Sequence, residues 1–211
     1  VAATGHDPEG KPIPGRFHTY PEMAAAGLWT TPTDLARFLL EIRQALAGQS
    51  SVISADTAKL MTTVVKEGYG LGLSLQRLGP AASFGHGGSN EGFRCHMTAF
   101  IANGRGVVIM TNSDSGGRLA SEILRAVAQE YDWPSNKPQV KTTVEVPPAA
   151  LAALEGRYEM SPGHVITIVL EGKTLFAIDG KQRIELYAES ETRFFELVEE
   201  TTVVFTKGPD G

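Results

Sequence analysis

Apolar residues recur with a helical period in the first quarter of the chain. Five of them, spaced three and four residues apart, would share one face of a helix: Leu35, Phe38, Leu39, Ile42 and Leu46. Thr31 and Pro32 precede them as a capping residue and a proline at the first helical position, and Gly48 is a natural stop. The pattern therefore predicts a helix over residues 31–47. Two more helices are expected, over residues 54–61 with Ser54 as N-cap and over residues 119–131.

After Tyr69, small and apolar residues alternate, so the apolar pattern no longer has a helical period but repeats every two residues. The run Gly-Leu-Gly-Leu-Ser-Leu predicts a strand with small residues on one side, which implies close packing against that side. Further strands are expected at residues 83–86, 93–102 and 106–111, with Asn103-Gly104 as a hairpin turn between the last two. The first 22 residues contain four prolines and three glycines and are expected to form a loop. Residues 1–133 thus predict an α+β fold built on an antiparallel meander.

A change in composition at Trp133-Pro134 predicts a boundary between two parts of the chain. Residues 134–148 are rich in proline and lysine and are expected to be a linker. Beyond them, in residues 149–211, five short β-prone runs alternate with turn residues: 165–170, 174–178, 183–186, 194–198 and 203–206. This spacing predicts a small all-β domain, either an antiparallel sheet or a barrel.

Composition excludes several classes of function. The 19 basic and 24 acidic residues give a net charge of −5, with no extended basic cluster, so a nucleic-acid partner is not expected. No apolar run approaches the roughly 20 residues that span a bilayer. Cys95 is the only cysteine, which excludes an internal disulfide. Nucleotide binding has no glycine motif to support it, and no cofactor is expected.

The strongest candidate for chemistry is the segment from Phe84 to Phe93, where His86, Gly87, Gly88, Ser89 and Asn90 follow a predicted strand. An imidazole carries protons near neutral pH, and glycines let a substrate approach backbone N–H groups that hold an oxyanion. Taken alone, His-Gly-Gly is a weak motif. A glycine-rich turn with an incidental histidine remains an alternative.

Other constellations of polar residues are weaker. His86, Glu91, Cys95 and His96 include metal-ligand types, but strand alternation sends Cys95 and His96 to opposite faces, so no metal site is expected. Asp114 lies between two serines like the start of a calcium loop, yet no glutamate closes such a loop, and a polar turn that caps the following helix is expected instead.

Two tryptophans have more than one interpretation. Trp29 lies just before the first predicted helix, and Trp133 lies at the predicted boundary. Each would either line a pocket or pack in a core, and for Trp29 packing is the preferred interpretation.

Four segments occur in an order that resembles a known family. They are Ala25 to Phe38 (AAGLWTTPTDLARF), Tyr69 to Leu73 (YGLGL), Gly85 to Gly88 (GHGG) and Gly106 to Asn112 (GVVIMTN). Together they resemble the carboxy-terminal half of the class C β-lactamase, esterase and D-peptidase group, within the serine β-lactamase and penicillin-binding-protein superfamily. The resemblance covers residues 1–133 and implies a partial β-lactamase-like antiparallel sheet with packed helices.

The resemblance also implies roles for the glycine-rich segment. In the family a His-x-Gly triplet lies on the strand that lines the active site and faces the nucleophile. His86 would then be the cation or hydrogen-bond donor of this motif, and Gly88 would keep the strand open. The backbone N–H of Ser89 would be half of an oxyanion hole, and Gly87, Gly88 and Asn90 would contact the substrate.

The sequence departs from the family where the nucleophile is concerned. Neither Ser-x-x-Lys nor Tyr-x-Asn occurs, Gly-x-Ser-x-Gly is absent, and the nearest imitation is Thr63 with Lys66. We therefore expect a fragment of a serine hydrolase that acts on an amide or ester through an acyl-enzyme, with its nucleophile in a missing amino-terminal segment. β-Lactams, D-amino-acid peptides and short esters are all candidate substrates. The alternative is a non-catalytic module that binds a ligand or partner.

The last 60 or so residues resemble a second element of the same family. The run Leu154 to Glu159 (LEGRYE) is similar to the start of the lipocalin-like accessory domain that follows many catalytic domains of the group. The likeness implies further strands after Gly211. Because a fragment without its amino-terminal half would leave apolar surface of the sheet uncovered, we also expect association with the missing segment, association with a second copy, or aggregation. The family resemblance as a whole implies a periplasmic or secreted location.

Overall fold

The computed structural model describes residues 2–76, 79–180, 182–197 and 201–208, and it divides the chain into two compact units. Unit 1 is Val1–Pro138 and unit 2 is Gln139–Gly211. The elements of unit 1 are α1 (Met23–Ala26), α2 (Pro32–Leu46), α3 (Ala55–Met61), β1 (Ser74–Gln76), the 3-10 turn η1 (Gly79–Ala81), β2 (Ser83–Asn90), β3 (Phe93–Phe100), β4 (Gly106–Thr111) and α4 (Gly116–Glu130). The predicted α+β class is confirmed.

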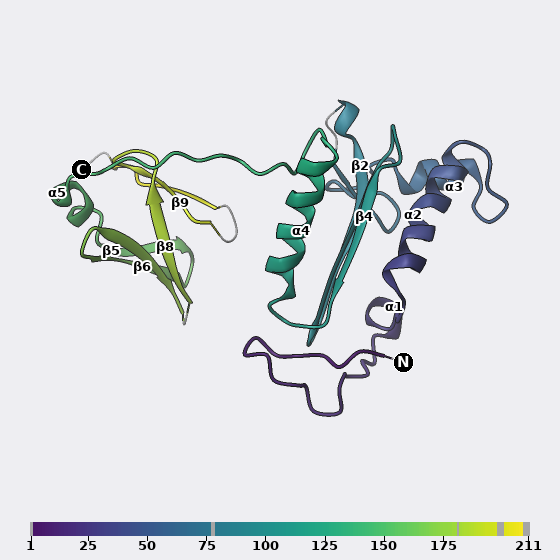
Figure 1. Ribbon diagram of the computed structural model, residues 1–211, viewed down its shortest axis with the longest axis horizontal. Coiled ribbons are helices and arrows are strands. Elements are labelled where there is room, and N and C mark those ends of the chain that lie inside the picture. The colour runs from purple at the N-terminus through teal and green to yellow at the C-terminus, as the bar shows by residue number, and fades with distance from the viewer. Residues whose placement is uncertain (1, 77–78, 181, 198–200, 209–211) are drawn as a thin grey trace. The chain divides into compact units, whose positions relative to one another are not determined.

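Unit 1 is a three-layer arrangement around one antiparallel sheet. The strand order is β1-β2-β3-β4, and α2 and α4 lie on opposite faces of the sheet (Figure 1). Ile42 of α2 is fully buried and packs with Phe84 of β2 on one face. On the other face Phe100 meets the edge of Trp133, whose side chain is 2% exposed, so Trp133 belongs to the core. The helices cover both faces of the sheet and leave its edges open.

The two capped helices form as the sequence predicts. The Thr31 hydroxyl accepts a hydrogen bond from the Asp34 N–H, and the Ser54 hydroxyl accepts one from the Thr57 N–H. Each bond satisfies one of the free amides of a first helical turn. The polar turn expected at residues 113–115 does precede α4, with Ser115 as the N-cap, but no side chain caps the helix, and Asp114 pairs with Arg94 of β3 instead.

The strand predicted after Tyr69 is mostly a turn. Only Ser74–Gln76 is a strand, and Tyr69 makes isolated bridges to Lys66 and Ser74. The reason lies in the glycines: Gly72 has a φ of +76°, and a Cβ on Gly70 would lie 2.0 Å from the carbonyl oxygen of Met61. The close packing implied by small residues is therefore present, but against the end of α3 rather than across a sheet.

The remaining strands of unit 1 follow the sequence with changed ends. The strand predicted at 83–86 continues to Asn90, the one predicted at 93–102 ends at Phe100, and the third runs over residues 106–111 as expected. Gly104 has a φ of +65° and donates its N–H to the carbonyl of Phe100, which confirms the turn at Asn103-Gly104. The glycines of β2 did not stop the strand because β3 pairs with every residue of it.

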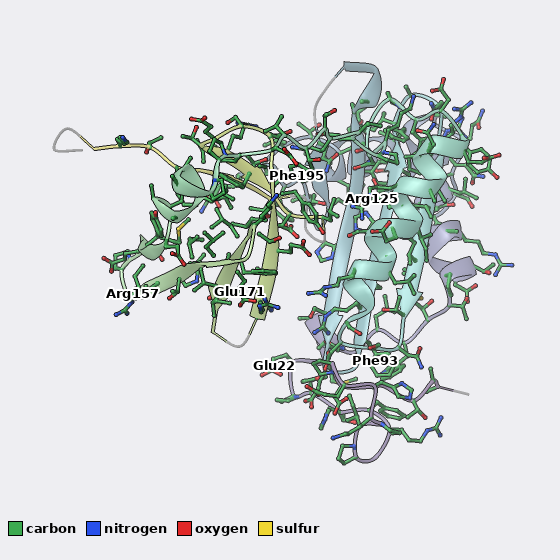
Figure 2. The ribbon with its side chains drawn as sticks, turned by 60° about the vertical axis from the view of Figure 1, so that its left-hand side comes forward. Glu22, Phe93, Arg125, Arg157, Glu171 and Phe195 are labelled. Carbon is green, nitrogen blue, oxygen red and sulfur yellow. The ribbon has the colours of Figure 1, made fainter. Side chains whose placement is uncertain are left out.

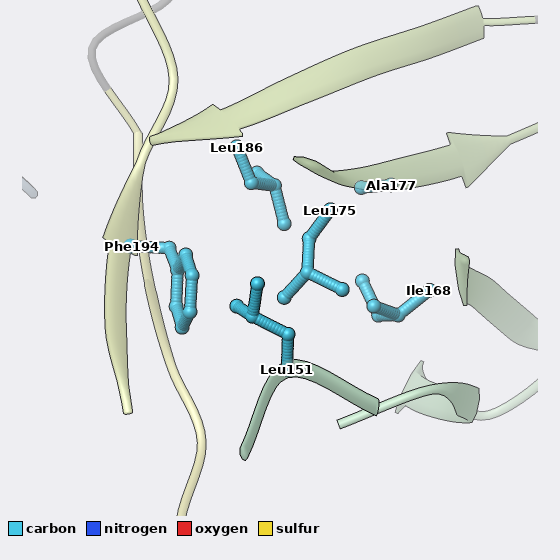
Figure 3. Packing of buried hydrophobic residues seen from close by; sticks show 6 residues of the cluster. All are labelled: Leu151, Ile168, Leu175, Ala177, Leu186 and Phe194. Carbon is cyan, nitrogen blue, oxygen red and sulfur yellow. The ribbon is translucent and has the colours of Figure 1, made fainter. Parts of the chain in front are cut away.

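Unit 2 is an antiparallel sheet that curls around its own hydrophobic core. Its elements are α5 (Pro148–Ala152), β5 (Gly156–Ser161), β6 (His164–Glu171), β7 (Thr174–Asp179), β8 (Gln182–Ala188), β9 (Arg193–Phe195) and β10 (Thr202–Val204), and its six strands follow in the order β10-β9-β8-β7-β6-β5. Figure 3 shows Leu151 of α5 packed against Ile168, Leu175 and Phe194 inside the sheet. Strand β5 and helix α5 were not predicted, and Val198 of the fourth predicted run lies outside the described residues.

Candidate functional site

Strand β2 is paired on both sides over only part of its length. β1 pairs with Ser83, Phe84 and Gly85 and then ends, whereas β3 pairs with all of β2. Among the described residues, positions 86–90 therefore have a neighbouring strand on one side only. We call them the open half of β2. They contain every residue that the sequence analysis assigned to the site.

The backbone groups on the free side of the open half follow from the hydrogen-bond pattern. The N–H of Ile101 donates to the carbonyl of Ala82, which makes these two residues a hydrogen-bonded pair of the β2–β3 ladder. In an antiparallel ladder such pairs alternate, so residues 84, 86, 88 and 90 also bond to β3. The N–H and C=O groups of Gly87 and Ser89 must then point away from β3. The open half presents these groups at its unpaired edge.

Side chains of the open half alternate between the two faces of the sheet. His86, Gly88 and Asn90 lie on the face that carries α2, together with Phe84. Gly87 and Ser89 lie on the α4 face, opposite His96 and Arg94 of β3. The side chains of His86 and Ser89 are therefore on opposite faces. The backbone N–H of Ser89, rather than its hydroxyl, lies at the same free edge of β2 as the imidazole of His86.

The imidazole of His86 is exposed at the start of the open half. Its Nδ1 lies 2.5 Å from the carbonyl oxygen of Gly87, the next residue along the strand. A neutral ring with its proton on Nδ1 donates to that oxygen and leaves Nε2 as an acceptor, and a protonated ring donates from both nitrogens. The ring can thus serve as either a proton acceptor or a donor at Nε2.

Gly88 is a glycine because of its neighbour across the ladder. A Cβ built on Gly88 would lie 2.5 Å from the Sγ of Cys95, its partner on β3. A Cβ on Gly87 would meet nothing closer than the carbonyl oxygen of Cys95 at 3.7 Å, which is an ordinary contact. Partial burial raises the pKa of the Cys95 thiol, so this sulfur stays protonated and acts as packing beneath the open half.

The turn that ends the open half is held by the amino-terminal loop. The Asn90 side-chain amide donates to the carbonyl of Ala26 at 2.9 Å, and the N–H of Glu91 donates to the Tyr20 hydroxyl at 3.0 Å. The Glu91 carboxylate lies 3.2 Å from Nε2 of His18. Because the amide nitrogen of Asn90 is engaged, its Oδ1 is the atom left for a substrate.

A ring cluster and an ion pair fix the same turn from its other sides. Phe93 lies at the end of the sheet beside the amino-terminal loop (Figure 2), and its ring meets the edge of Trp29 with centroids 5.3 Å apart. Trp29, which is 46% exposed, therefore packs on the rim of unit 1. Arg94 Nη1 pairs with the Asp114 carboxylate at 2.8 Å, and that carboxylate also accepts the N–H of Gly92. These contacts hold the backbone of the open half in place.

Arg94 and Asp114 are supporting residues that sequence reasoning did not assign to the site. Arg94 could have been assigned from the two-residue turn Glu91-Gly92. This turn sets the register of the hairpin and thereby places Arg94 opposite Ser89. The sequence placed Asp114 only in a polar turn before a helix, after a calcium loop had been set aside. Its pairing joins the end of β4 to the hairpin of β2 and β3, which no local pattern reveals.

The other candidate residues are not brought into a reactive arrangement. Thr63 is exposed after α3, and the amine of Lys66 lies 3.7 Å from the carboxylate of Glu67. Within the described residues no cluster of three or more histidine, cysteine, aspartate or glutamate side chains is placed to hold a metal ion. His96 lies on the α4 face, away from Cys95, and its burial lowers the pKa of its ring.

Comparison with known proteins identifies the fold. The beta-lactamase family model matches residues 1–132. Penicillin-binding protein 4* of Bacillus subtilis (strain 168) is 28% identical over 149 residues, which cover 67% of this chain and 33% of that protein. The octameric penicillin-binding protein homologue from Pyrococcus abyssi has a structure similar to this one with a TM-score of 0.53 and 23% identity, over 95% of this chain and 48% of that chain. The chain spans less than half the length of these two relatives.

The fold, together with the open half of β2, defines a penicillin-binding-protein-like α+β domain. Because the family model matches 132 of the 211 residues, the chain belongs to the beta-lactamase family. The family resemblance expected from the four sequence segments is thereby confirmed. In the described part of the chain, every helix is too short or too polar to cross a bilayer.

Proposed function

We propose that the open half of β2 is one wall of the active site of a serine hydrolase that cleaves an amide or ester bond through an acyl-enzyme. The observation that carries this proposal is the combination of an exposed imidazole with two outward backbone amides, those of Gly87 and Ser89, on a strand edge without a partner. Family membership supports a hydrolase of the serine type.

The Ser89 amide has the role of an oxyanion donor in this proposal. When a hydroxyl attacks the substrate carbonyl, the carbonyl oxygen becomes negatively charged, and a preorganised N–H next to it lowers the energy of that state. A rigid strand is suited to this task because its amide does not need to reorganise during the reaction. The contacts of Arg94, Asp114 and Tyr20 with the turn supply that rigidity.

His86 has the role of proton carrier or hydrogen-bond donor. In the acylation step the nucleophile loses a proton and its oxygen bonds to the carbonyl carbon, the bond from that carbon to the leaving nitrogen or oxygen breaks, and the leaving amine or alcohol takes up a proton. Water then attacks the acyl-enzyme and the acid is released. The contact of Nδ1 with the Gly87 carbonyl leaves Nε2 of His86 without a partner among the described residues, and in this proposal Nε2 exchanges a proton with the leaving group while Oδ1 of Asn90 accepts a hydrogen bond from the substrate.

The nucleophile and its base are proposed to come from polypeptide outside these 211 residues. No Ser-x-x-Lys is present in the sequence, and neither Thr63 nor Ser89 has an adjacent base among its described contacts. β-Lactams, D-amino-acid peptides and short esters all fit the proposed chemistry. The alternative function, a non-catalytic binding module, predicts that no reactive hydroxyl exists in either form of the protein.

The proposal is tested by covalent labelling with a fluorophosphonate and with a fluorescent penicillin, read by intact mass. The reagents are applied to the 211-residue chain and to the product of the complete open reading frame. We expect one adduct on the longer protein and none on the 211-residue chain. In the longer protein His86→Ala is expected to slow labelling by about 10²–10⁴-fold, the usual contribution of a positioned proton carrier.

A matched control is the exposed histidine of unit 2. His164 contacts the carboxylate of Asp179 at 3.0 Å, and His164→Ala should leave the labelling rate unchanged. Absence of label from both forms would refute the proposal and favour the binding module. Label on the 211-residue chain would contradict an external nucleophile, and Thr63 and Ser89 would be the first residues to replace.

Two further properties of the chain belong to the same proposal. We propose that unit 2 is a lipocalin-like accessory domain, supported by its curled six-stranded sheet and internal core. We also propose that the chain associates with a missing segment or with a second copy. Large apolar side chains support this, since Leu28 and Tyr69 are 75% and 52% exposed, and the Pyrococcus abyssi homologue is octameric. A monodisperse monomer with a high, cooperative melting temperature would contradict the association.

A further inference from the structure

A cavity of about 220 Å³, partly open to solvent, lies behind the open half of β2, between the sheet and α4. The strands contribute Gly88, Arg94 and His96 to its lining, and the helix contributes Ala120, Ser121 and others. Two of the residues that line it, Gly88 and Gly117, have no side chain, and a Cβ on Gly117 of α4 would meet nothing within 4 Å. The cavity therefore touches the strand that carries the proposed oxyanion amide, from the opposite side to His86.

The volume fits a group the size of an aromatic ring. Apolar cavities of roughly 150 Å³ are known to bind benzene, whereas one water molecule needs about 30 Å³. Leu124 and Ala120 supply an apolar wall from α4, and the Ser121 hydroxyl and the His96 ring supply polar atoms. Neither polar group makes a hydrogen bond to another described residue, so both are available to a ligand.

The charges around the cavity are already balanced. Arg94 is the cation of the lining, and Nη1 of its side chain pairs with Asp114 and donates to the carbonyls of Asn90 and Phe93. Asp114 comes two residues before α4, and the partial positive charge at the start of a helix favours an anion at such a position. Burial lowers the pKa of His96 and favours its neutral ring. A ligand carboxylate would find no unpaired cation here.

We infer that this cavity binds an uncharged, ring-sized group in preference to an anionic one. Binding alone does not depend on the proposed hydrolase function. Its use as a subsite for part of the substrate does rest on that function. In that role, the bound ring would lie against Gly88 and the strand that presents the Ser89 amide, and it would select neutral esters or amides over substrates with a carboxylate at this place.

The inference is tested with benzamide and benzoate, two molecules of nearly identical shape that differ in charge. The 211-residue chain is titrated with each at millimolar concentrations near pH 7.5, and the His96 ring signals and the Ser121 amide are followed by NMR. Benzamide is expected to shift both signals and to bind at least ten-fold more tightly than benzoate. Equal or tighter binding of benzoate, or no shift with benzamide, would overturn the inference.

Variants locate the site and test the charge argument. Gly117→Leu and Ser121→Leu place a larger side chain in the cavity and should each weaken benzamide binding at least ten-fold, whereas Gln129→Leu near the far end of α4 should not change it. Asp114→Asn keeps an acceptor for the Gly92 N–H but frees the charge of Arg94, so it should increase benzoate affinity several-fold. Unchanged benzamide binding in both filled variants, checked to be folded by circular dichroism, would contradict the location.

Discussion

The two halves of β2 belong to one strand and have opposite properties. Residues 83–85 are buried, paired on both sides and packed into the core, with Ser83 at 3% and Phe84 at 1% exposure. Residues 86–90 have a partner on one side only, and His86, Gly87 and Ser89 are exposed. The difference arises where β1 ends. Stability resides in the first half, which leaves the second half free to carry groups that bind or react.

The largest expected effect separates the halves by stability. Phe84→Ala should lower the free energy of unfolding by about 3–5 kcal/mol, because it leaves a cavity in a packed core. His86→Ala, two residues along the strand, should change it by less than about 0.5 kcal/mol, because the ring is exposed. Urea unfolding followed by circular dichroism measures both. A similar cost for the two substitutions would mean that the halves are not distinct.

A smaller effect distinguishes the two glycines of the open half. Gly88→Ala should cost about 1 kcal/mol more than Gly87→Ala, since its Cβ meets the Sγ of Cys95 at 2.5 Å and forces that side chain to move. Cys95→Ala should remove the difference. The double-mutant cycle is read from urea midpoints. If Gly88→Ala still cost more than Gly87→Ala in the Cys95→Ala background, the need for glycine at position 88 would come from its backbone conformation instead.

The histidine behind the open half gives a pH dependence. Burial lowers the pKa of His96 in the folded state, so the unfolded chain takes up a proton first as the pH falls below about 6.5. The stability contributed by the neutral ring is present above that pH and declines on acidification. The melting temperature should therefore fall between pH 7.5 and pH 5.5, and fall less in His96→Gln. An equal decrease in both proteins would assign the effect to other groups.

The smallest expected effect lies at the tip of the open half. The side chains of His18 and Glu91 are 40% and 59% exposed, and an ion pair this open to water contributes little. Glu91→Gln should thus lower the free energy of unfolding by no more than about 0.5 kcal/mol in urea titrations. A larger cost would show that this contact, rather than Arg94 with Asp114, holds the turn.

Local patterns in the sequence predict the regular elements of unit 1 well. The helix of Pro32–Leu46 and the capped start of α3 follow from periodicity and capping residues, which act within a few positions along the chain. The strand expected after Tyr69 fails because Gly70 lies against the carbonyl of Met61, a contact between elements that alternation does not encode. The sequence pattern was interpreted as small residues packed against a neighbouring layer of a sheet. In the structure Gly70 instead allows the turn after α3 to approach the backbone of Met61 closely.

The candidate site was predicted in part. The glycine-rich segment identified His86 and Ser89, but it did not show that β1 ends before them, and this ending is what exposes their edge. Arg94 and Asp114 could not be assigned, because their 2.8 Å contact joins residues 20 positions apart through the register of a sheet.

The short length of β1 has a consequence for the exchange of backbone hydrogens with solvent. Amides at His86, Gly88 and Asn90 bond to β3 and should exchange slowly with deuterium, whereas those of Gly87 and Ser89 face the unpaired edge and should exchange fast. Fast and slow amides would thus alternate residue by residue along one strand. Any molecule that docked along the edge would make all of them slow, so this alternation serves as a direct record of whether the edge is occupied.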